Sequence, residues 1–461
     1  MVTEANPITD WTGKRVTVMG LGRFGGGVGV TRWLARGGAR VLATDEAPAE
    51  KLQPALRDIA DLPVELRLGC HDERDFRDTD LVVVNPAVRE SSPFLAAATA
   101  AGVPITTEIN LFVERCRGVT VGVTGSVGKS TTTAMIGHVL ERTLRGRRVW
   151  VGGNIGRSLL DTLPEIGRDD PVVLELSSFQ LARTPAARWS PRVGVLTNLE
   201  PNHLDWHPSY ADYVSAKLNL FAFQDAPRDH AIVGRGAEGD PRVAAFLAQR
   251  PATWRFVVDD RTPIATRPSA LADGDRREWP DAKLRVPGRH NLENAAAALL
   301  VSELLGIEAD AAIAALASFA GLPHRLQRVV ERDGVTYFND SKSTTPESAI
   351  TALNAVDLRP LLVILGGYDK HVDLRGAAQV AAQRAAFAAC IGQTGPMLRE
   401  AISAAGGDAE FFASLEDAVR ACRRRATRGG AVLLSPACAS WDMFEDYRAR
   451  GEQFVQLVTQ P

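Results

Sequence analysis

The feature that most constrains the fold is an alternation of short apolar runs with alanine-rich stretches along the whole chain. Runs such as RVTVMG, VTVGVTG and PLLVILGG are rich in β-branched residues, which is typical of parallel strands covered by helices on both faces. The runs fall into three groups. The sequence therefore predicts an α/β protein with three domains.

Local sequence signals mark the two joins between these domains. One join lies near Phe112, just ahead of a glycine-rich loop, and the other at residues 321–323, where a glycine and a proline follow an alanine-rich stretch. The predicted domains are residues 1–112, 113–321 and 322–461. Between residues 249 and 287 the pattern weakens, so irregular or β-hairpin structure is expected there.

The charge balance favours a small-molecule substrate. Lysine plus arginine (53) nearly equals aspartate plus glutamate (55), so neither nucleic acid nor a membrane surface is an expected partner. The chain begins without a basic segment followed by an apolar one and holds no run of about 18 apolar residues, which predicts a cytoplasmic protein. Its five cysteines lack a CxxC pair and are expected to be free thiols.

A loop suited to phosphate follows the apolar run at residues 119–123. Gly125 and Gly128 let the backbone approach an anion at the start of a helix. Lys129 can then reach the outer phosphates, and the Ser130 hydroxyl can bind magnesium, although the general pattern GxxxxGK[ST] wants a glycine at Val123. The expected ligand is a nucleoside triphosphate. Its predicted contacts are Thr124, Gly125, Ser126, Val127, Gly128, Lys129, Ser130 and Thr131.

Two further strand ends carry groups that suit a metal ion. Glu175 ends the apolar run VVLE and is positioned to hold magnesium directly or through water. His203 and Asp205 follow the run VGVLTN on a predicted loop. In isolation this pair is as well explained by a solvated loop, but the glutamate and the phosphate loop favour a metal site.

A second glycine-rich stretch, GLGRFG, follows the first apolar run, with Asp45 about 20 residues later, as in a dinucleotide fingerprint. The extra glycines Gly26, Gly27 and Gly29 make this turn unlike a compact fingerprint. Nothing downstream resembles a hydride-transfer site, which argues against a dehydrogenase. We expect this domain to bind another nucleotide or phosphate; a glycine turn without a ligand is the alternative.

Ten motifs occur in the order and approximate spacing of the Mur ligases, which the chain resembles over nearly its whole length. They are TGSVGKST, GGNIG, LELSSFQL, TNLEPNHLDWH, YVSAKLNLF, GRHNLENAAAA, GLPHR, FNDSKSTTP, LGGYDK and LLSPACASWDMF. Folylpolyglutamate synthases share the ATPase core of this family, but the SSFQ and ACAS segments resemble the muramyl enzymes.

This resemblance implies a fold and an activity. The first and third domains are expected to be Rossmann-like, and the middle one a P-loop ATPase-like α/β domain. The implied reaction adds glutamate to UDP-N-acetylmuramoyl-L-alanine, with ATP and through an acyl phosphate, in peptidoglycan precursor synthesis. D-Glutamate is the expected amino acid, while L-glutamate stays open because Tyr447 stands where phenylalanine is common. A monomer is expected.

The resemblance also implies which residues act. The implied catalytic residues are Lys129, Glu175, His203 and Lys217. Two magnesium sites are implied, with Ser130, Glu175, His203 and a carbamylated Lys217 as ligands. Without the resemblance, Lys217 would be interpreted as an exposed lysine on a helix. Further implied ATP contacts are Asn294, Arg325 and Asp340.

Two more sets of residues are implied for the other substrates. The nucleotide sugar is expected to contact Leu21, Gly22, Asp45, Asn154 and His203. The amino acid is expected to contact Lys342, Thr344, Lys370, Ser440 and Tyr447. Two lysines together with hydroxyl groups suit the two carboxylates of glutamate.

The chain departs from the family pattern at several positions. Val127 stands where asparagine is usual, Asn202 replaces an aspartate, and Asn-Pro-Ala at residues 85–87 replaces Ser-Pro-Gly. A rival of another class is a binding protein that closes on ATP without chemistry. The presence of Lys129, Glu175 and Lys217 argues against it.

Overall fold

The structure is a computed structural model that describes residues 10–22, 25–156, 158–225, 227–249, 254–257, 265–268, 277–278, 284–286 and 288–460. The chain forms two compact units, Met1–Asp281 with Glu293–Ala315, and Ala282–Leu292 with Leu316–Pro461. Within the described residues, none of the helices has the length and apolar character needed to cross a membrane.

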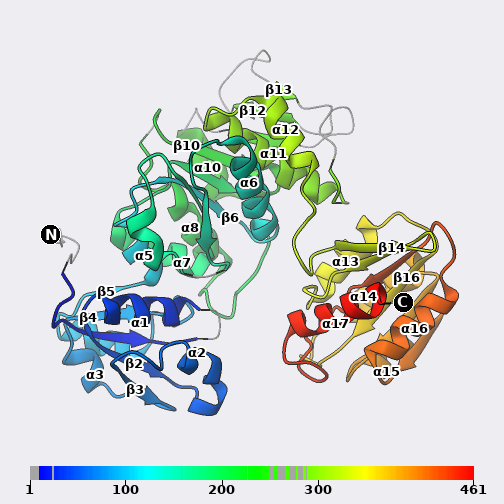
Figure 1. Ribbon diagram of the computed structural model, residues 1–461, viewed down its shortest axis with the longest axis horizontal. Helices are drawn as coiled ribbons and strands as arrows, with labels where there is room; N and C mark the ends of the chain where they lie inside the picture. Colours follow the sequence, from blue (N-terminus) through cyan, green and yellow to red (C-terminus); the bar gives the residue numbers. More distant parts are fainter. Residues whose placement is uncertain are drawn as a thin grey trace. The chain divides into compact units, whose positions relative to one another are not determined.

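A five-stranded parallel sheet begins the first unit, in the strand order β3-β2-β1-β4-β5 (Figure 1). Its strands are β1 (Arg15–Met19), β2 (Arg40–Asp45), β3 (Val64–Leu68), β4 (Leu81–Val84) and β5 (Ile105–Thr106). Its helices are α1 (Gly26–Arg36), α2 (Gln53–Arg57), α3 (Arg74–Arg77), α4 (Pro93–Ala100) and α5 (Glu108–Val113), with a 3-10 turn at Ala49–Lys51. Because the strands are parallel, the turns after β1, β2 and β4 meet at one edge.

An eight-stranded sheet follows in the same unit, ordered β13-β12-β11-β10-β9-β6-β8-β7. Its strands are β6 (Val119–Thr124), β7 (Trp150–Gly153), β8 (Pro171–Glu175), β9 (Val193–Leu196), β10 (His230–Gly234), β11 (Trp254–Val257), β12 (Ala265–Pro268) and β13 (Arg277–Glu278). Strand β12 pairs antiparallel with both β11 and β13. This confirms β-hairpin structure between residues 249 and 287, where the sequence pattern weakens. The other positions predicted to be irregular there lie largely outside the described residues.

Helices and 3-10 turns accompany the eight-stranded sheet. They are α6 (Lys129–Thr143), α7 (Ser178–Arg183), α8 (Tyr210–Leu218), α9 (Arg235–Glu238), α10 (Pro241–Gln249), α11 (Arg289–Leu304) and α12 (Ala309–Ala317), with turns at Leu160–Glu165, Thr184–Ala187 and Asn219–Phe221. The boundary between the two compact units falls within α11 and within α12.

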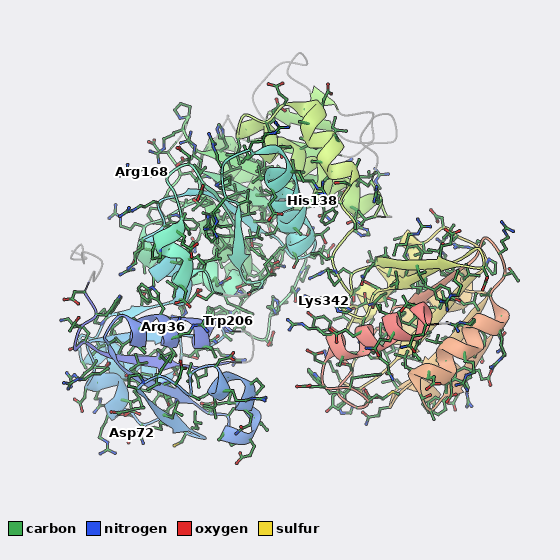
Figure 2. All side chains as sticks on the ribbon, in the orientation of Figure 1. Arg36, Asp72, His138, Arg168, Trp206 and Lys342 are labelled. Atoms are coloured by element: carbon green, nitrogen blue, oxygen red, sulfur yellow. The ribbon has the colours of Figure 1, made fainter. Side chains whose placement is uncertain are left out.

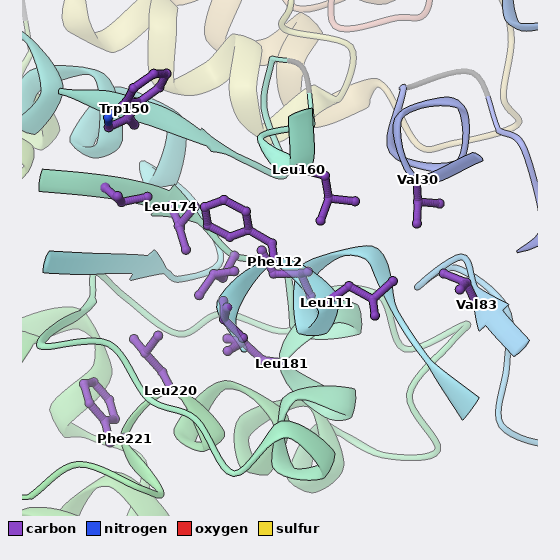
Figure 3. Packing of buried hydrophobic residues seen from close by; sticks show 14 of the residues in the cluster. Val30, Val83, Leu111, Phe112, Trp150, Leu160, Leu174, Leu181, Leu220 and Phe221 are labelled. Atoms are coloured by element: carbon purple, nitrogen blue, oxygen red, sulfur yellow. The ribbon is translucent and has the colours of Figure 1, made fainter. Parts of the chain in front are cut away.

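One hydrophobic core joins the two sheets of the first unit. Val30 of α1 and Val83 of β4 belong to the same buried cluster as Leu174 of β8 and Leu181 of α7 (Figure 3). Phe112, at the predicted join, is only 1% exposed within this cluster. Burying a side chain of this size stabilises the fold by roughly 2 to 3 kcal/mol, so the two sheets are held together by packing rather than by a linker.

The second unit is built on a six-stranded sheet, ordered β14-β15-β19-β16-β17-β18, in which only the β14–β15 pair is antiparallel. Its strands are β14 (Gln327–Arg332), β15 (Val335–Asn339), β16 (Leu361–Gly366), β17 (Phe387–Ile391), β18 (Ala409–Phe412) and β19 (Ala431–Leu434). Its helices are α13 (Pro346–Ala355), α14 (Arg375–Arg384), α15 (Gly395–Ala404), α16 (Leu415–Arg425) and α17 (Tyr447–Thr459).

Two separate cores cover the faces of this sheet. Leu353 of α13 and Leu398 of α15 pack in one cluster, and Val419 of α16 with Phe454 of α17 pack in the other. Helices on both faces explain why β16 and β19 are apolar at every position. The three sheets with their helices confirm the predicted α/β class.

Candidate active site

The predicted phosphate loop runs from the end of β6 to the start of α6. Gly128, the residue before α6, has φ of 82°, and Gly125 has φ of 152°. A Cβ on Gly125 would lie 1.9 Å from Oγ1 of Thr197. Both positions therefore require glycine, and the turn leads directly into the N-terminus of α6, where a helix favours an anion.

Neighbouring strands hold this loop in place. The backbone N–H of Val127 donates to Oδ1 of Asn198 (2.9 Å), while Nδ2 of Asn198 and Oγ1 of Thr197 donate to the Val127 carbonyl (3.0 and 2.8 Å). The Val127 side chain itself is 53% exposed. Asn198 thus supplies the amide that anchors the loop, a role that the sequence did not assign to it.

Hydroxyl groups of the loop are also used internally. Oγ1 of Thr124 donates to the Leu176 carbonyl (2.7 Å). Oγ of Ser126 lies 2.6 Å from the Tyr213 hydroxyl and donates to the Glu200 carbonyl (2.9 Å). The first turn of α6 places Ser130 and Thr131 directly after the loop.

Lys129 folds back over the loop. Its Nζ donates to the carbonyls of Gly125 (2.9 Å) and Ser126 (2.8 Å). Behind it, Oγ1 of Thr132 donates to Oδ1 of Asn294 (3.0 Å). Asn294 therefore contacts the first turn of α6, within the first unit.

Glu175 presents one unused carboxylate oxygen. It ends β8 directly beside Val123 of β6, and it is 2% exposed. Oε1 accepts a hydrogen bond from Nδ2 of Asn154 (2.9 Å), whereas buried Oε2 has no partner among the described residues. A buried carboxylate oxygen without a partner, on the strand paired with the one that leads into the phosphate loop, fits magnesium bound mainly by water and phosphate.

Other metal chemistry is not indicated by the described residues. No group of three or more histidine, cysteine, aspartate or glutamate side chains gathers there in a metal-binding arrangement. Magnesium needs only one or two protein carboxylates when it also binds a nucleotide, and Glu175 can supply one.

Lys217 is buried, not exposed as its position on a helix would suggest. It is 1% exposed, and its Nζ donates to the Gly125 carbonyl (2.8 Å) and to Oγ1 of Thr124 (3.3 Å). Burial, together with the charge of Lys129, lowers the pKa of Lys217 well below the usual lysine value, against the opposing effect of Glu175. The burial therefore shifts this lysine toward its neutral, nucleophilic form.

His203 lies on an exposed loop with φ of 54°. Partial burial of its ring, followed by the charge of Lys129, lowers its pKa. The ring packs edge-on against Phe179 at 4.8 Å between centroids. A neutral imidazole of this kind can ligate a metal.

The same loop contains a buried histidine that the sequence analysis did not single out. His207 is 3% exposed and lies 2.9 Å from Oγ of Ser178, and Phe179 stacks on it. Trp206, labelled in Figure 2, donates from Nε1 to the Ala87 carbonyl of the first sheet (2.9 Å). No spacing in the sequence links these positions, because the link forms only when the two sheets pack together.

A cavity of about 270 Å³ lies in the first unit between its two sheets. The predicted residues that line it are Leu21, Gly22 and Asn154. Asn85, Glu108 and Phe179 also line it; of these, Glu108 carries no signal in the sequence, while Phe179 belongs to the SSFQ segment. The cavity thus extends from the first glycine turn to the residue that contacts Glu175.

Asp45 supports the first glycine turn. Its Oδ2 accepts from the N–H of Gly22 (3.3 Å) and its Oδ1 from the N–H of Ala47 (2.8 Å). Asn85 packs against the same turn, since a Cβ on Gly20 would lie 2.9 Å from the Asn85 Cβ. Asp45 therefore contacts the glycine turn through these hydrogen bonds.

Glu108 is an ionisable residue of the cavity wall. Its carboxyl hydrogen-bonds the hydroxyl of Ser158. Burial raises the pKa of Glu108 to about 7. A carboxyl that is half protonated at neutral pH is less repulsive to an anionic ligand than an ordinary glutamate.

The second unit carries the other predicted residues at the ends of β15, β16 and β19. Nζ of Lys342, the residue labelled in the second unit in Figure 2, lies 5.1 Å from the Tyr447 ring centroid. Nζ of Lys370 lies 5.2 Å from the ring centroid of Trp441. Ser440 is 2% exposed and Lys370 is exposed. The N–H of Thr344 donates to the Lys342 carbonyl (2.9 Å).

Asp340 is committed to hydrogen bonds within the second unit. Its Oδ1 accepts from the N–H of Leu326 (2.9 Å), and its Oδ2 accepts from the hydroxyls of Ser343 (2.5 Å) and Ser435 (2.9 Å). Burial raises the pKa of Asp340 to about 6 despite these bonds. Asp340 thus shapes the turn that carries Arg325.

A strand, a glycine loop and a helix that begins with Lys129, together with the carboxylate of Glu175 on a neighbouring strand, are the features of a P-loop nucleotide-dependent enzyme. The chain belongs to the Mur ligase family and is an ATP-dependent ligase, as its motifs predicted. Family models match residues 14–107 (Mur ligase MurD-like, N-terminal domain), 123–302 (Mur ligase middle domain) and 324–438 (Mur ligase, glutamate ligase domain).

Relatives and solved structures agree with this membership. The UDP-N-acetylmuramoylalanine–D-glutamate ligase of Pelotomaculum thermopropionicum is 37% identical over 467 residues, which cover 98% of each chain. That of Geobacter metallireducens is 37% identical over 454 residues, 97% of each chain. A UDP-N-acetylmuramate-alanine ligase structure from Thermotoga maritima shares the fold, with a TM-score of 0.58 at 20% identity over 97% of this chain and 99% of that one.

Proposed function

We propose that this enzyme joins D-glutamate to UDP-N-acetylmuramoyl-L-alanine, using ATP, in peptidoglycan precursor synthesis. The names and near-complete coverage of its relatives support this reaction. The structural observation that carries it is the cavity that extends from the glycine turn at Gly22 to Asn154, which in turn contacts Glu175. A nucleotide sugar in this cavity would reach toward the phosphate loop.

The chemistry would proceed in two steps. The carboxylate of the L-alanyl group attacks the γ-phosphorus of ATP, the bond to the β-phosphate oxygen breaks, and ADP leaves. The amine of glutamate then attacks the acyl carbon, the bond to phosphate breaks, and the amine proton leaves with the phosphate. Such transfers need alignment and charge neutralisation more than covalent help from the protein.

Residues of the first unit would supply this alignment. The Lys129 ammonium, already held over the loop by two carbonyls, would turn toward the β- and γ-phosphates. Magnesium, when bound, neutralises phosphate charge. Ser130 and Glu175 would hold one ion, and His203 with Lys217 a second.

Lys217 would serve as a carbamate. Its neutral amine adds to carbon dioxide, which forms an N–C bond, releases a proton and converts a base into an anion able to bind magnesium. Its buried position and depressed pKa support this reaction, because only the unprotonated amine reacts.

The remaining predicted residues would bind the substrates. Leu21, Gly22, Asp45, Asn154 and His203 would hold or shape the nucleotide-sugar site. Asn294, Arg325 and Asp340 would complete the ATP site with Thr124, Gly125, Ser126, Val127, Gly128, Lys129, Ser130 and Thr131. Lys342, Thr344, Lys370, Ser440 and Tyr447 would hold glutamate, whose two carboxylates match two lysines. We also propose a cytoplasmic monomer that needs neither nucleic acid nor membrane.

The test is phosphate release from ATP with magnesium and UDP-N-acetylmuramoyl-L-alanine, with product mass recorded. Three arms contain D-glutamate, L-glutamate or no amino acid. Release with a mass gain of one glutamate in the D-glutamate arm alone is expected. The same result in the L-glutamate arm alone would assign the other isomer, and turnover in neither arm would favour a binding protein that lacks catalysis.

A further inference from the structure

The second unit contains a fully buried arginine that the proposed function does not yet use. Arg450 lies on α17 and is 0% exposed, and it is the largest of the fully buried side chains described. A guanidinium loses a great deal of hydration on burial, so its environment must replace that hydration with hydrogen bonds.

The Arg450 guanidinium donates four hydrogen bonds that replace this hydration, and their acceptors lie in two chain segments. Nε donates to Oγ of Ser341 (3.0 Å), and Nη2 donates to the Ser341 carbonyl (2.9 Å). Nη2 also donates to the Cys438 carbonyl (3.1 Å), and Nη1 donates to the Ala439 carbonyl (3.2 Å). The planar fork of arginine allows one side chain to serve acceptors in several directions.

Both segments lead directly into the proposed glutamate site. Ser341 precedes Lys342, and Ala439 precedes Ser440. They follow β15 and β19, which are adjacent parallel strands, so their ends meet at one edge of the sheet. The Ser341 hydroxyl also donates to the Tyr447 carbonyl (2.8 Å), which ties a third proposed contact to the same hub.

A third segment lies against the guanidinium. A Cβ on Gly367, just after β16, would lie 3.1 Å from Nη1 of Arg450. The N–H of Tyr368 donates to the same Ala439 carbonyl that accepts from Arg450 (2.8 Å). This segment continues to Lys370, so the arginine lies behind all three strand ends that carry proposed glutamate contacts.

The charge of Arg450 is not neutralised by a salt bridge. Among the described residues, no carboxylate forms an ion pair with it. Asp442 is the neighbouring acidic residue, and its Oδ2 is occupied by the N–H of Gln393 (2.8 Å). Burial lowers the pKa of Arg450 to about 10, which leaves it protonated at neutral pH, so its field favours an anion nearby.

We propose that Arg450 is a positioning residue for the incoming amino acid, an inference that rests on the proposed function. It fixes the backbones that carry Lys342, Lys370 and Ser440 in one arrangement. It also adds a buried positive charge behind the place where the two carboxylates of glutamate bind. It touches no substrate itself.

The experiment compares wild type with Arg450→Met and Arg450→Lys in full steady-state kinetics. The apparent KM for glutamate is expected to rise about tenfold or more in Arg450→Met, the size expected for loss of charged hydrogen bonds. The KM values for ATP and the nucleotide sugar should stay within about twofold, because loops of the first unit supply most of their proposed contacts. Arg450→Lys keeps the charge but loses the planar guanidinium. Its KM for glutamate should lie between those of the wild type and Arg450→Met.

Arg332→Met is the matched control. Arg332 also donates to backbone carbonyls of the chain end, those of Thr459 (2.8 Å) and Gln460, but far along α17 from the proposed site. Its removal should change stability without changing the KM for glutamate. Thermal unfolding of each variant separates loss of fold from loss of affinity.

Each outcome is decisive. An equal rise in all three KM values, or an unchanged KM for glutamate in Arg450→Met, would overturn the proposal. If Arg450→Met does not fold, Arg450→Lys decides by the same split between substrates, and wild-type constants in that variant would also overturn it. Failure of wild type to use glutamate would instead refute the proposed function, which keeps the two failures distinct.

Discussion

The side-chain amide of Asn154 donates a hydrogen bond of 2.9 Å to Oε1 of Glu175, and its backbone N–H donates one of 2.7 Å to the Glu175 carbonyl. Asn154 also lines the cavity between the two sheets of the first unit. One residue thus orients the carboxylate proposed for magnesium and forms part of the wall of the proposed nucleotide-sugar site.

Replacing Asn154 with leucine should therefore weaken magnesium use. Leucine has nearly the same shape but cannot donate to Oε1, so the carboxylate loses its orientation. The magnesium concentration for half-maximal rate is expected to rise about 10- to 100-fold, as is typical when a residue that orients a metal ligand is lost. Titration of magnesium against phosphate release measures this. Asn219→Leu, which removes an amide bonded to the Leu181 carbonyl, should leave the titration unchanged.

Lys217→Met should stabilise the unliganded protein at neutral pH. The native pKa of Lys217 lies well below the unfolded value of 10.5, so unfolding takes up a proton between these two values and the lysine disfavours folding there. The gain in melting temperature should shrink as pH rises toward 10.5 and vanish well above it, where both states are neutral. Thermal unfolding in buffer free of carbon dioxide tests this, and a gain independent of pH, or equal in the exposed Lys51→Met, would contradict it.

Asp340 should make the protein less stable as pH rises, which is opposite to the effect expected of Lys217. Its native pKa of about 6 exceeds the ordinary 3.8, so the native state holds the proton more tightly. As pH rises from 3.8 to about 6, the free energy of unfolding of the wild type should therefore fall by roughly 3 kcal/mol relative to that of Asp340→Asn.

Denaturant unfolding at several pH values within this window measures the difference. Asp373→Asn is the control, because hydrogen bonds from Arg375 hold the pKa of Asp373 at about 2, below the window. A flat difference for Asp340→Asn would show that its carboxyl is not perturbed by burial.

Trp206→Phe should weaken binding of the nucleotide sugar. The ring would still pack on Phe179, but the hydrogen bond of 2.9 Å to the Ala87 carbonyl would be lost. A loss of about 1 kcal/mol, or roughly fivefold in KM for the nucleotide sugar, is expected. Trp150→Phe removes a comparable bond to Asp170 (3.1 Å) and should leave this KM unchanged, and equal effects of both changes would refute the specific role of Trp206.

The phosphate loop could be predicted from sequence because its determinants are local. An apolar run, two glycines and a lysine lie within one short segment, between Val119 and Ser130, and Gly125 and Gly128 take the positive φ angles that favour glycine. The alternation of apolar runs likewise predicted the sheets, since period and length are properties of short segments.

Residues that act through distant contacts could not be predicted in this way. Asn198 anchors the loop from another strand, and Glu108 reaches the cavity only because the two sheets share a core. Lys217 resembles a surface lysine in its helix, and its burial depends on β6 lying beside α8. The role of Arg450 could not be predicted from sequence either, because its hydrogen-bond partners are more than a hundred residues away or on another loop.

The core that runs through Phe112 has a consequence for inhibitor discovery. Val30, Leu111 and Leu174 are close-packed members of one cluster, and close packing resists gradual deformation. Val30 and Val83 belong both to this core and to the cavity wall, so this part of the wall is expected to keep its shape when a nucleotide binds. A small molecule selected against the resting enzyme should be anchored there.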